Sequence, residues 1–491
     1  MKRIVIILIA LIAITSCQDY LDVNKDPNNA SQTTPALTLP AGIASAAGQF
    51  ASYYNIVGGM WVQYWTQNNG SNQYKNIDSY NVQQSTLNTN FNELYSGSLE
   101  DLQYVRDESK KAGDWSLYLM GTVMQCYVFQ MLADTYDQIA FDEALHGSEI
   151  LHPNYRSGQQ VYDSLIVRLD DALSKDFDAI TVTNPGSSDF LFGGSVTSWI
   201  QFANTLKLKI YLRQVYARPE VANPGIQGLY DNGAEFLAES AAMTQFVDQE
   251  NKSNPLYECD QRKLNTAQNI KASKTFMDFL LNNSDPRVDA LFIPGSGGQK
   301  GLEQGNFGAP TTVVNPATIS RALIQATDPV YFLSAAESYF LQAEAAARGF
   351  GSDDEKELYE AGISAAFEQL GLDASDAEAL FQTGGPYEYP GADLDSNLKA
   401  IMTQKWVALA GFEGMEAFFE RNRTGYPAHT DLDYSDAGYE LGTLVYPIGG
   451  SSGTGNFPMR LLFPETEQNR NPNTPSQVPF TTKVWWDKND D

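Results

Sequence analysis

Apolar residues recur every three or four positions over several long stretches of this chain, and that spacing limits its fold more than any other feature. It gathers apolar side chains on one face of a helix, which must then be buried against other helices. The clearest stripe consists of Leu333, Ala336, Phe340, Ala343 and Ala347. Because strands and helices do not alternate along the chain, no parallel sheet is expected. The sequence therefore predicts a mainly α fold with minor β structure.

The same spacing predicts individual helices at residues 36–65, 90–110, 115–135, 158–173 and 198–216, and a helical hairpin at 331–347 and 352–370. Ser352 is the expected N-cap of the second hairpin helix, and Gly371 is expected to end it. The hairpin resembles a tetratricopeptide repeat, a unit of roughly 34 residues. Segments rich in glycine and proline, such as 294–312 and 425–479, predict long irregular loops, with short strands at 443–447 and 482–486.

The first residues form a targeting signal. A basic start at Lys2 and Arg3 precedes an uncharged apolar run at 4–14, which as a helix would rise only about 16 Å and could not cross a bilayer core of roughly 30 Å. The segment that ends at Cys17 resembles a bacterial lipobox, which implies a signal peptide at 1–16 and a diacylglycerol on the Cys17 sulfur. An ordinary secretory signal with a chance cysteine is the alternative. Residues 17–34 are polar and predict a tether, and 35–491 are expected to form a single domain.

The charge of the chain excludes several functions. With 32 basic and 60 acidic residues its net charge is -28, which repels nucleic acid, so no nucleic-acid partner is expected. Three cysteines, without a CxxC pair, cannot form a disulfide framework or a zinc site. Only three histidines occur, none in a metal or triad spacing, and no nucleotide-binding or hydrolase motif is present. We expect no enzyme and no cofactor. Two alternatives stay open at this point: a glycosidase pair of carboxylates, whose separation in space the sequence does not give, and an acidic loop that holds a structural calcium ion.

Five stretches, spread from Cys17 to Pro427, resemble the SusD/RagB family, particularly its SusD-like branch. They are Cys17–Asp22 with Asn24, Pro27 and Asn28; the segment from Trp199 to Leu208, which ends at Arg213; Asp285-Pro286-Arg287; Ala336-Glu337 with Ala343-Glu344-Ala345; and Lys405–Leu409 followed by Glu416–Glu420 and Arg423–Pro427. One departure occurs at Asp137-Gln138-Ile139-Ala140, where the family often has Gly-Asp-Ile-Pro.

The resemblance implies a SusD-like helical scaffold with about four tetratricopeptide-like helix pairs and irregular loops that carry a ligand site. It also implies a lipoprotein anchored in the outer membrane and facing the cell exterior. Such a protein binds a nutrient, most often a glycan or oligosaccharide, and passes it to a TonB-dependent transporter of the SusC type. A peptide or another nutrient as ligand, a scaffold role and a glycoside hydrolase are the alternatives.

A glycan site requires aromatic rings that stack on sugars, beside amides and carboxylates that bind hydroxyl pairs. The stretch from 61 to 80 combines these residue types, and we expect its ligand-binding residues to be Trp65, Asn69, Tyr74, Asp78 and Tyr80. Trp61 and Tyr64 sit at helical spacing and are more readily explained as core residues. Later loops contribute the weaker candidates Tyr257, Phe307 and Tyr426.

Overall fold

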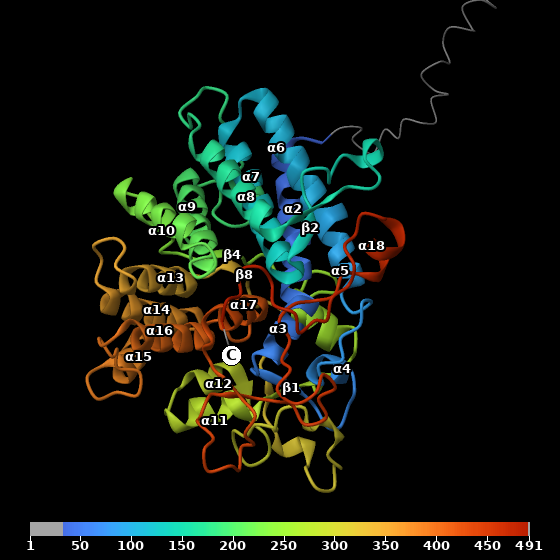
Figure 1. The fold of residues 1–491 in the computed structure, drawn as a ribbon, viewed down its shortest axis with the longest axis vertical. Coiled ribbons are helices and arrows are strands. Elements are labelled where there is room, and N and C mark those ends of the chain that lie inside the picture. Colours follow the sequence, from blue (N-terminus) through green and yellow to red (C-terminus); the bar gives the residue numbers. More distant parts are fainter. Residues whose placement is uncertain (1–32, 490–491) are drawn as a thin grey trace, which may run out of the picture.

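Helices make up about half of the computed structural model, which describes residues 33–489, and strands are few and short (Figure 1). The helices of the first half are α2 (Pro35–Gln49), α3 (Asn55–Trp61), α4 (Lys75–Asp78), α5 (Asn88–Glu93), α6 (Glu100–Ala112), α7 (Trp115–Tyr136), α8 (Gly158–Leu173), α9 (Val196–Arg213) and α10 (Pro219–Asp231). Those of the second half are α11 (Lys274–Asn282), α12 (Arg287–Leu291), α13 (Ala335–Ala347), α14 (Glu355–Gln369), α15 (Ala374–Phe381), α16 (Leu394–Ala408), α17 (Gly414–Thr424) and α18 (Glu465–Arg470). The expectation of a mainly α fold is confirmed.

Short strands join segments that are far apart in sequence. An antiparallel four-stranded sheet has the order β1 (Trp65–Gln67), β5 (Ile270–Ala272), β7 (Arg321–Ala322), β6 (Phe292–Ile293). Three two-stranded ladders pair β2 (Gln138–Ala140) with β3 (Tyr155–Ser157), β4 (Ala241–Met243) with β8 (Val330–Leu333), and β9 (His429–Thr430) with β10 (Leu444–Val445). Figure 1 shows α6–α10 at one end of the long axis, and β1, α11 and α12 at the other end.

Several predicted helices match the structure because their ends carry recognisable caps. The α7 helix starts at the predicted residue, and the Asp114 side chain accepts the backbone N–H of Leu117. The α8 helix has the predicted bounds, with a capping box between Ser157 and Gln160. Close packing pairs α6 with α7, α9 with α10, and α13 with α14. That these pairs follow a tetratricopeptide repeat stays a prediction.

Other expectations about elements are wrong. The single helix predicted at 36–65 is divided into α2, a π-helical segment η1 (Phe50–Tyr54) and α3, and it ends before β1. Residues 331–333 belong to strand β8 and not to the hairpin helix. Asp354, not Ser352, caps α14, because its carboxylate accepts the backbone N–H groups of Lys356 and Glu357. The range 482–486 contains no strand, whereas 443–447 contains β10.

The charged residues that carry the family resemblance meet in one buried cluster. The Lys209 Nζ lies 2.7 Å from Glu416 Oε2, and the Lys405 Nζ lies 3.0 Å from Glu420 Oε2. The Arg423 guanidinium bridges Glu344, at 2.6 Å, and Glu420, at 2.7 Å. All of these side chains are at most 6% exposed. These motif residues therefore join α9, α13, α16 and α17, and their role is to hold the scaffold.

Residues near the N-terminus lie outside the described part of the chain. This applies to the predicted signal peptide at 1–16, to the lipidation site Cys17, and to the tether at 17–34 except its last two residues. Within residues 33–489, every helix is too short or too polar to span a bilayer.

Candidate ligand-binding site

Four of the five residues expected to bind a ligand are buried. Trp65, Tyr74, Asp78 and Tyr80 are between 0% and 2% exposed. The Asp78 carboxylate accepts hydrogen bonds from Thr66 Oγ1 at 2.8 Å and from the backbone N–H of Gln67 at 3.0 Å. Burial raises the pKa of Asp78 to about 7. In this structure Asp78 therefore ties α4 to β1, and its oxygens face protein donors.

The other predicted residues are also held by intramolecular contacts. Asn69 is half-buried, and its Nδ2 donates to the carbonyl oxygens of Ala309, at 3.1 Å, and Val314, at 2.8 Å. The Tyr80 ring packs edge-on against the Tyr446 ring, with centroids 5.9 Å apart. Their role in ligand binding stays a prediction. In the structure, these contacts hold the 65–80 segment in place.

An open groove of about 820 Å³ lies beside this segment. Its walls come from the end of α2, from η1, from residues 86–90 and from residues 243–263, including a second π-helical segment η5 (Tyr257–Arg262). Tyr53 and Phe246 supply half-buried aromatic rings. The polar lining includes Gln49, Asn90, Gln245, Asn251, Ser253 and Glu258. Ligand sites commonly have volumes of roughly 300–1,000 Å³ and this mixture of aromatic and polar groups.

The groove has its present shape because the first long helix is interrupted. Ser52 in η1 has φ -100° and ψ -114°, outside the helical region, and its hydroxyl donates to the carbonyl oxygen of Gly48 at 2.6 Å. This break presents Ser52 and Tyr53 to the groove. Insertions of the π type interrupt α-helices and often occur at functional sites.

The buried Tyr74 contacts two walls of the groove, η1 and η5. Its ring packs edge-on against Tyr53, with centroids 6.3 Å apart, and its hydroxyl donates to Asp260 Oδ1 on η5 at 2.9 Å. The predicted segment 61–80 is thus adjacent to the groove. Its buried Tyr74 does not line the groove but packs against Tyr53, which does. Sequence reasoning missed the lining residues Gln245, Phe246 and Ser253, which belong to an irregular segment without a motif.

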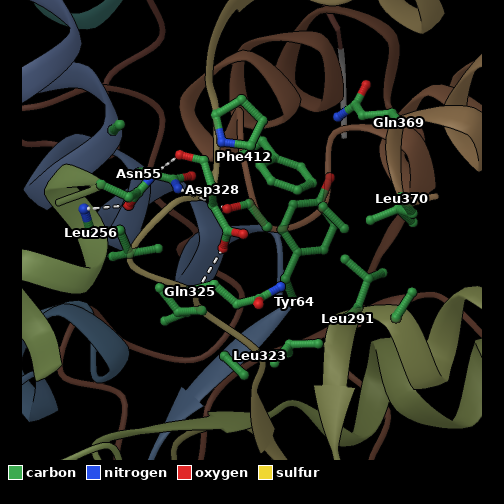
Figure 2. Close-up of a pocket in the computed structure, with 18 of the residues that line it drawn as sticks. Asn55, Tyr64, Leu256, Leu291, Leu323, Gln325, Asp328, Gln369, Leu370 and Phe412 are labelled. Atoms are coloured by element: carbon green, nitrogen blue, oxygen red, sulfur yellow. Dashed lines mark hydrogen bonds between the residues drawn. The ribbon is translucent and has the colours of Figure 1, made fainter. Parts of the chain in front are cut away.

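A second hollow, here called the chamber, is smaller and more enclosed, with a volume of about 140 Å³. Figure 2 shows Asn55 and Leu256 on one side of it and Gln369 and Leu370 on the other. Tyr64, Trp65 and Phe412 are among its lining residues, of which Tyr64 and Trp65 are 0% and 2% exposed and Phe412 is half-buried. Its polar lining groups include Asn254, Gln325, Asp328 and Gln369.

The groove and the chamber share two segments of the chain, residues 51–55 and residues 253–258, which line both hollows with different residues. On the helical side, Ser52 and Tyr53 line the groove, whereas Ala51 and Asn55 line the chamber. On the facing segment, Ser253, Pro255 and Glu258 line the groove, whereas Asn254 and Leu256 line the chamber. The same two segments therefore shape both hollows.

The weaker candidates are dispersed. Tyr257 lies on η5 with its ring 5.2 Å from the Arg262 guanidinium carbon. Phe307 lies in the short helical turn η6 (Asn306–Gly308), and Tyr426 donates to Asp395 Oδ1 at 2.7 Å. None of the three lines the groove or the chamber. Among residues 33–489, no group of three or more His, Cys, Asp or Glu is arranged to hold a metal ion, so no calcium site is proposed.

Comparison with known proteins identifies the family to which this chain belongs. Residues 27–445 match a SusD-like family described as "starch-binding associating with outer membrane". The chain belongs to this SusD-like family, and the resemblance noted in its motifs is confirmed. A search of curated proteins found no match.

Solved structures share the fold over nearly the whole chain. A chitin-binding SusD homolog from Flavobacterium johnsoniae is 23% identical, covers 92% of this chain and 99% of its own, and has a TM-score of 0.74. A SusD homolog from Bacteroides uniformis is 22% identical with the same coverage of 92% and 99% and a TM-score of 0.74. A SusD-like protein from Bacteroides thetaiotaomicron is 23% identical, with coverage of 93% and 99% and a TM-score of 0.72. At these identities the likeness shows the fold.

Proposed function

We propose that this protein binds a glycan at the cell surface and delivers it to a TonB-dependent transporter of the SusC type in the outer membrane. The observation that carries the proposal is the family match over residues 27–445, whose description combines starch binding with the outer membrane. The similar structure from Flavobacterium johnsoniae, described as chitin-binding, also supports a glycan ligand. The lipobox-like segment ending at Cys17 supports attachment through a lipid anchor.

The groove is the proposed site for the glycan chain. Its volume of about 820 Å³ accommodates several sugar units, and it is open to solvent along the surface. Tyr53 and Phe246 offer rings for stacking, and the amides of Gln49, Asn90 and Gln245 offer donors and acceptors to hydroxyl groups. Peptide ligands remain the second candidate, because backbone amides also pair with such side chains.

The groove favours binding over hydrolysis. Glycoside hydrolysis ordinarily requires two carboxyl groups on either side of the bond. Among the residues that line the groove, Glu258 is the only acid, and its Oε2 accepts from Arg262 Nε at 3.0 Å. We therefore propose a binding protein and not an enzyme.

A retention experiment tests this function. The purified mature chain is run in native gels that contain starch, chitin derivatives or other soluble polysaccharides, and binding is quantified by calorimetry. Replacing the groove aromatics, Tyr53→Ala and Phe246→Ala, is expected to weaken binding of the retained polysaccharide about tenfold each. Tyr216→Ala is the matched control, because Tyr216 is 41% exposed and does not line the groove. Equal retention of the wild type and both groove variants would contradict the assignment.

A further inference from the structure

We propose that the groove selects glycans that carry negative charge, as uronic acids or sulfated sugars do, through the ammonium groups of Lys252 and Lys263. The choice of a glycan as the ligand rests on the proposed function, whereas the preference for negative charge rests on the residues that line the groove. Starch and chitin, which the family description and the similar structure name, are neutral polymers. The preference for an anion therefore comes from the groove of this chain alone.

The charged residues that line the groove differ from those of the chain as a whole. They are Lys252, Glu258 and Lys263, so that two of the three are basic. Over the whole chain the acidic residues outnumber the basic ones, 60 to 32. Physiological salt screens exposed charges that lie more than about 8 Å apart. A ligand in the groove is therefore influenced more by these side chains than by the net charge of -28.

The single acid of the groove is already neutralised by the protein. Glu258 is 7% exposed, its Oε1 accepts from the backbone N–H of Asn251 at 3.2 Å, and its Oε2 accepts from Arg262 Nε at 3.0 Å. Arg262 also forms an ion pair with Asp248, and the exposed Glu250 does not line the groove. Both oxygens of Glu258 are thus occupied, and its charge is balanced before a ligand enters.

The two lysines, in contrast, are available to a ligand. Both are exposed, and within residues 33–489 neither ammonium group forms a salt bridge or a hydrogen bond with another side chain or carbonyl group. An ammonium group offers three donors and a compact positive charge. Its hydrogen bonds to a carboxylate or a sulfate are roughly twice as strong as those between neutral groups. The groove therefore gains more from an anionic sugar than from a neutral one.

The local backbone explains why both lysines face the groove. The N–H of Lys263 donates to the carbonyl oxygen of Glu258 at 3.0 Å, a π-type hydrogen bond at the end of η5. This wide turn brings Lys263 to the groove beside Glu258. Lys252 closes a tight loop, because its carbonyl oxygen accepts from the N–H of Val247 at 2.9 Å and its N–H donates to Gln249 at 3.0 Å. Hydrogen-bonded backbone therefore holds both lysines in place.

Pairs of polysaccharides that share a backbone and differ in charge test the proposal. The pairs are polygalacturonate and its methyl ester, alginate and its propylene glycol ester, and dextran sulfate and dextran. In native gels, the mature chain is expected to retain at least one anionic member more strongly than its neutral partner. Its affinity, measured by calorimetry, is expected to fall as NaCl rises from about 0.05 M to about 0.5 M. The first two pairs report on carboxylates, and the third reports on sulfates.

The lysines are tested by removing their charge. Lys252→Gln and Lys263→Gln are each expected to weaken binding of the retained anionic polysaccharide about threefold, and the double variant about tenfold. Binding of any neutral polysaccharide is expected to stay unchanged. Lys399→Gln is the matched control, because Lys399 is exposed on α16 and does not line the groove.

The outcomes separate the charge preference from the proposed function. Equal retention of both members of every pair, or retention of starch or chitin derivatives alone, would overturn the preference and leave glycan binding intact. An anionic preference that persists in the double variant would overturn the assignment to Lys252 and Lys263. The absence of retention of every polysaccharide would instead contradict the proposed function itself.

Discussion

Arg423 is the residue that we expect to matter most for stability, because it is 1% exposed and pairs with Glu344 and Glu420. The substitution Arg423→Ala leaves both carboxylates buried without this cation. Breaking such a buried pair typically costs about 3–5 kcal/mol, far more than a surface pair. Urea unfolding followed by circular dichroism measures the loss.

Arg348 provides the matched control for this prediction. It lies 2.9 Å from Glu344, the same carboxylate, but its side chain is 10% exposed. Water compensates part of a lost interaction at such a position, so Arg348→Ala is expected to cost about 1 kcal/mol. Equal losses in the two variants would contradict the prediction that the more deeply buried Arg423 contributes more to stability than Arg348.

Tyr74 tests whether the predicted aromatic segment contacts the ligand or supports the groove. Tyr74→Phe keeps the ring against Tyr53 and removes the hydroxyl that donates to Asp260. We expect a loss of about 1–2 kcal/mol in the free energy of unfolding, because Asp260 loses a partner, with little change in polysaccharide affinity. Calorimetry with the retained polysaccharide checks the second part. A large loss of affinity at unchanged stability would instead assign the hydroxyl to the ligand.

At the scale of elements, the contact between α3 and α17 depends on glycine. A Cβ added at Gly58 would lie 2.2 Å from the backbone carbon of Gly414 and 2.3 Å from the backbone nitrogen of Met415. Because backbone atoms cannot move aside cheaply, Gly58→Ala is expected to destabilise by about 1–3 kcal/mol or more. Gly48→Ala in α2 is the control: its Cβ would meet nothing within 4 Å, and it should stabilise by about 0.5–1 kcal/mol. Thermal unfolding of both variants decides between these outcomes.

Elements with local signals could be predicted from the sequence, and elements set by tertiary packing could not. The bounds of α7 and α8 follow from a continuous apolar spacing and from the caps Asp114 and Ser157. The break at Phe50–Tyr54 has no glycine or proline to announce it. Residues 331–333 continue the helical stripe, yet pairing with β4 makes them a strand. Long-range contacts decide in both cases.

The sequence predicts the region of the candidate site but not the residues that line it. The aromatic and amide pattern of 61–80 leads to the correct region, since Trp65 lines the chamber and Tyr74 lies behind the groove. Composition does not distinguish a ring that stacks on a sugar from one that packs in the core. The missed residues Phe246 and Asp328 come from segments distant in sequence, and only the fold brings them to α2 and β1.

At the scale of the whole molecule, buried carboxyl groups set the pH dependence of stability. Burial raises the pKa of Asp78 to about 7 and, with Glu337 adjacent, that of Glu413 to about 8. Burial also raises the pKa of Asp134 to about 6, although Arg213 opposes it. Between about pH 4 and these values the folded chain retains protons that the unfolded chain has lost. These three carboxyl groups therefore contribute a loss of stability as the pH rises from about 4 to 8, and His429, whose pKa burial lowers well below its usual value, contributes in the opposite direction below about pH 7.

Asp78→Asn isolates one of these contributions. The amide is neutral at every pH, so the variant does not have to bury a charge above pH 7, although its Nδ2 cannot accept the hydrogen bonds that Asp78 receives from Thr66 or Gln304. Raising the pKa of Asp78 from 3.8 to about 7 corresponds to about 4 kcal/mol. Relative to the wild type, the free energy of unfolding of Asp78→Asn should thus increase by up to about that amount between pH 4 and pH 8, so that the variant gains stability against the wild type as the pH rises. Urea titrations at several pH values measure this difference. A difference that stays constant with pH would mean that Asp78 is already ionised throughout the range, and that water or a cation reaches a carboxylate which the structure shows fully enclosed between β1, α4 and Gln304.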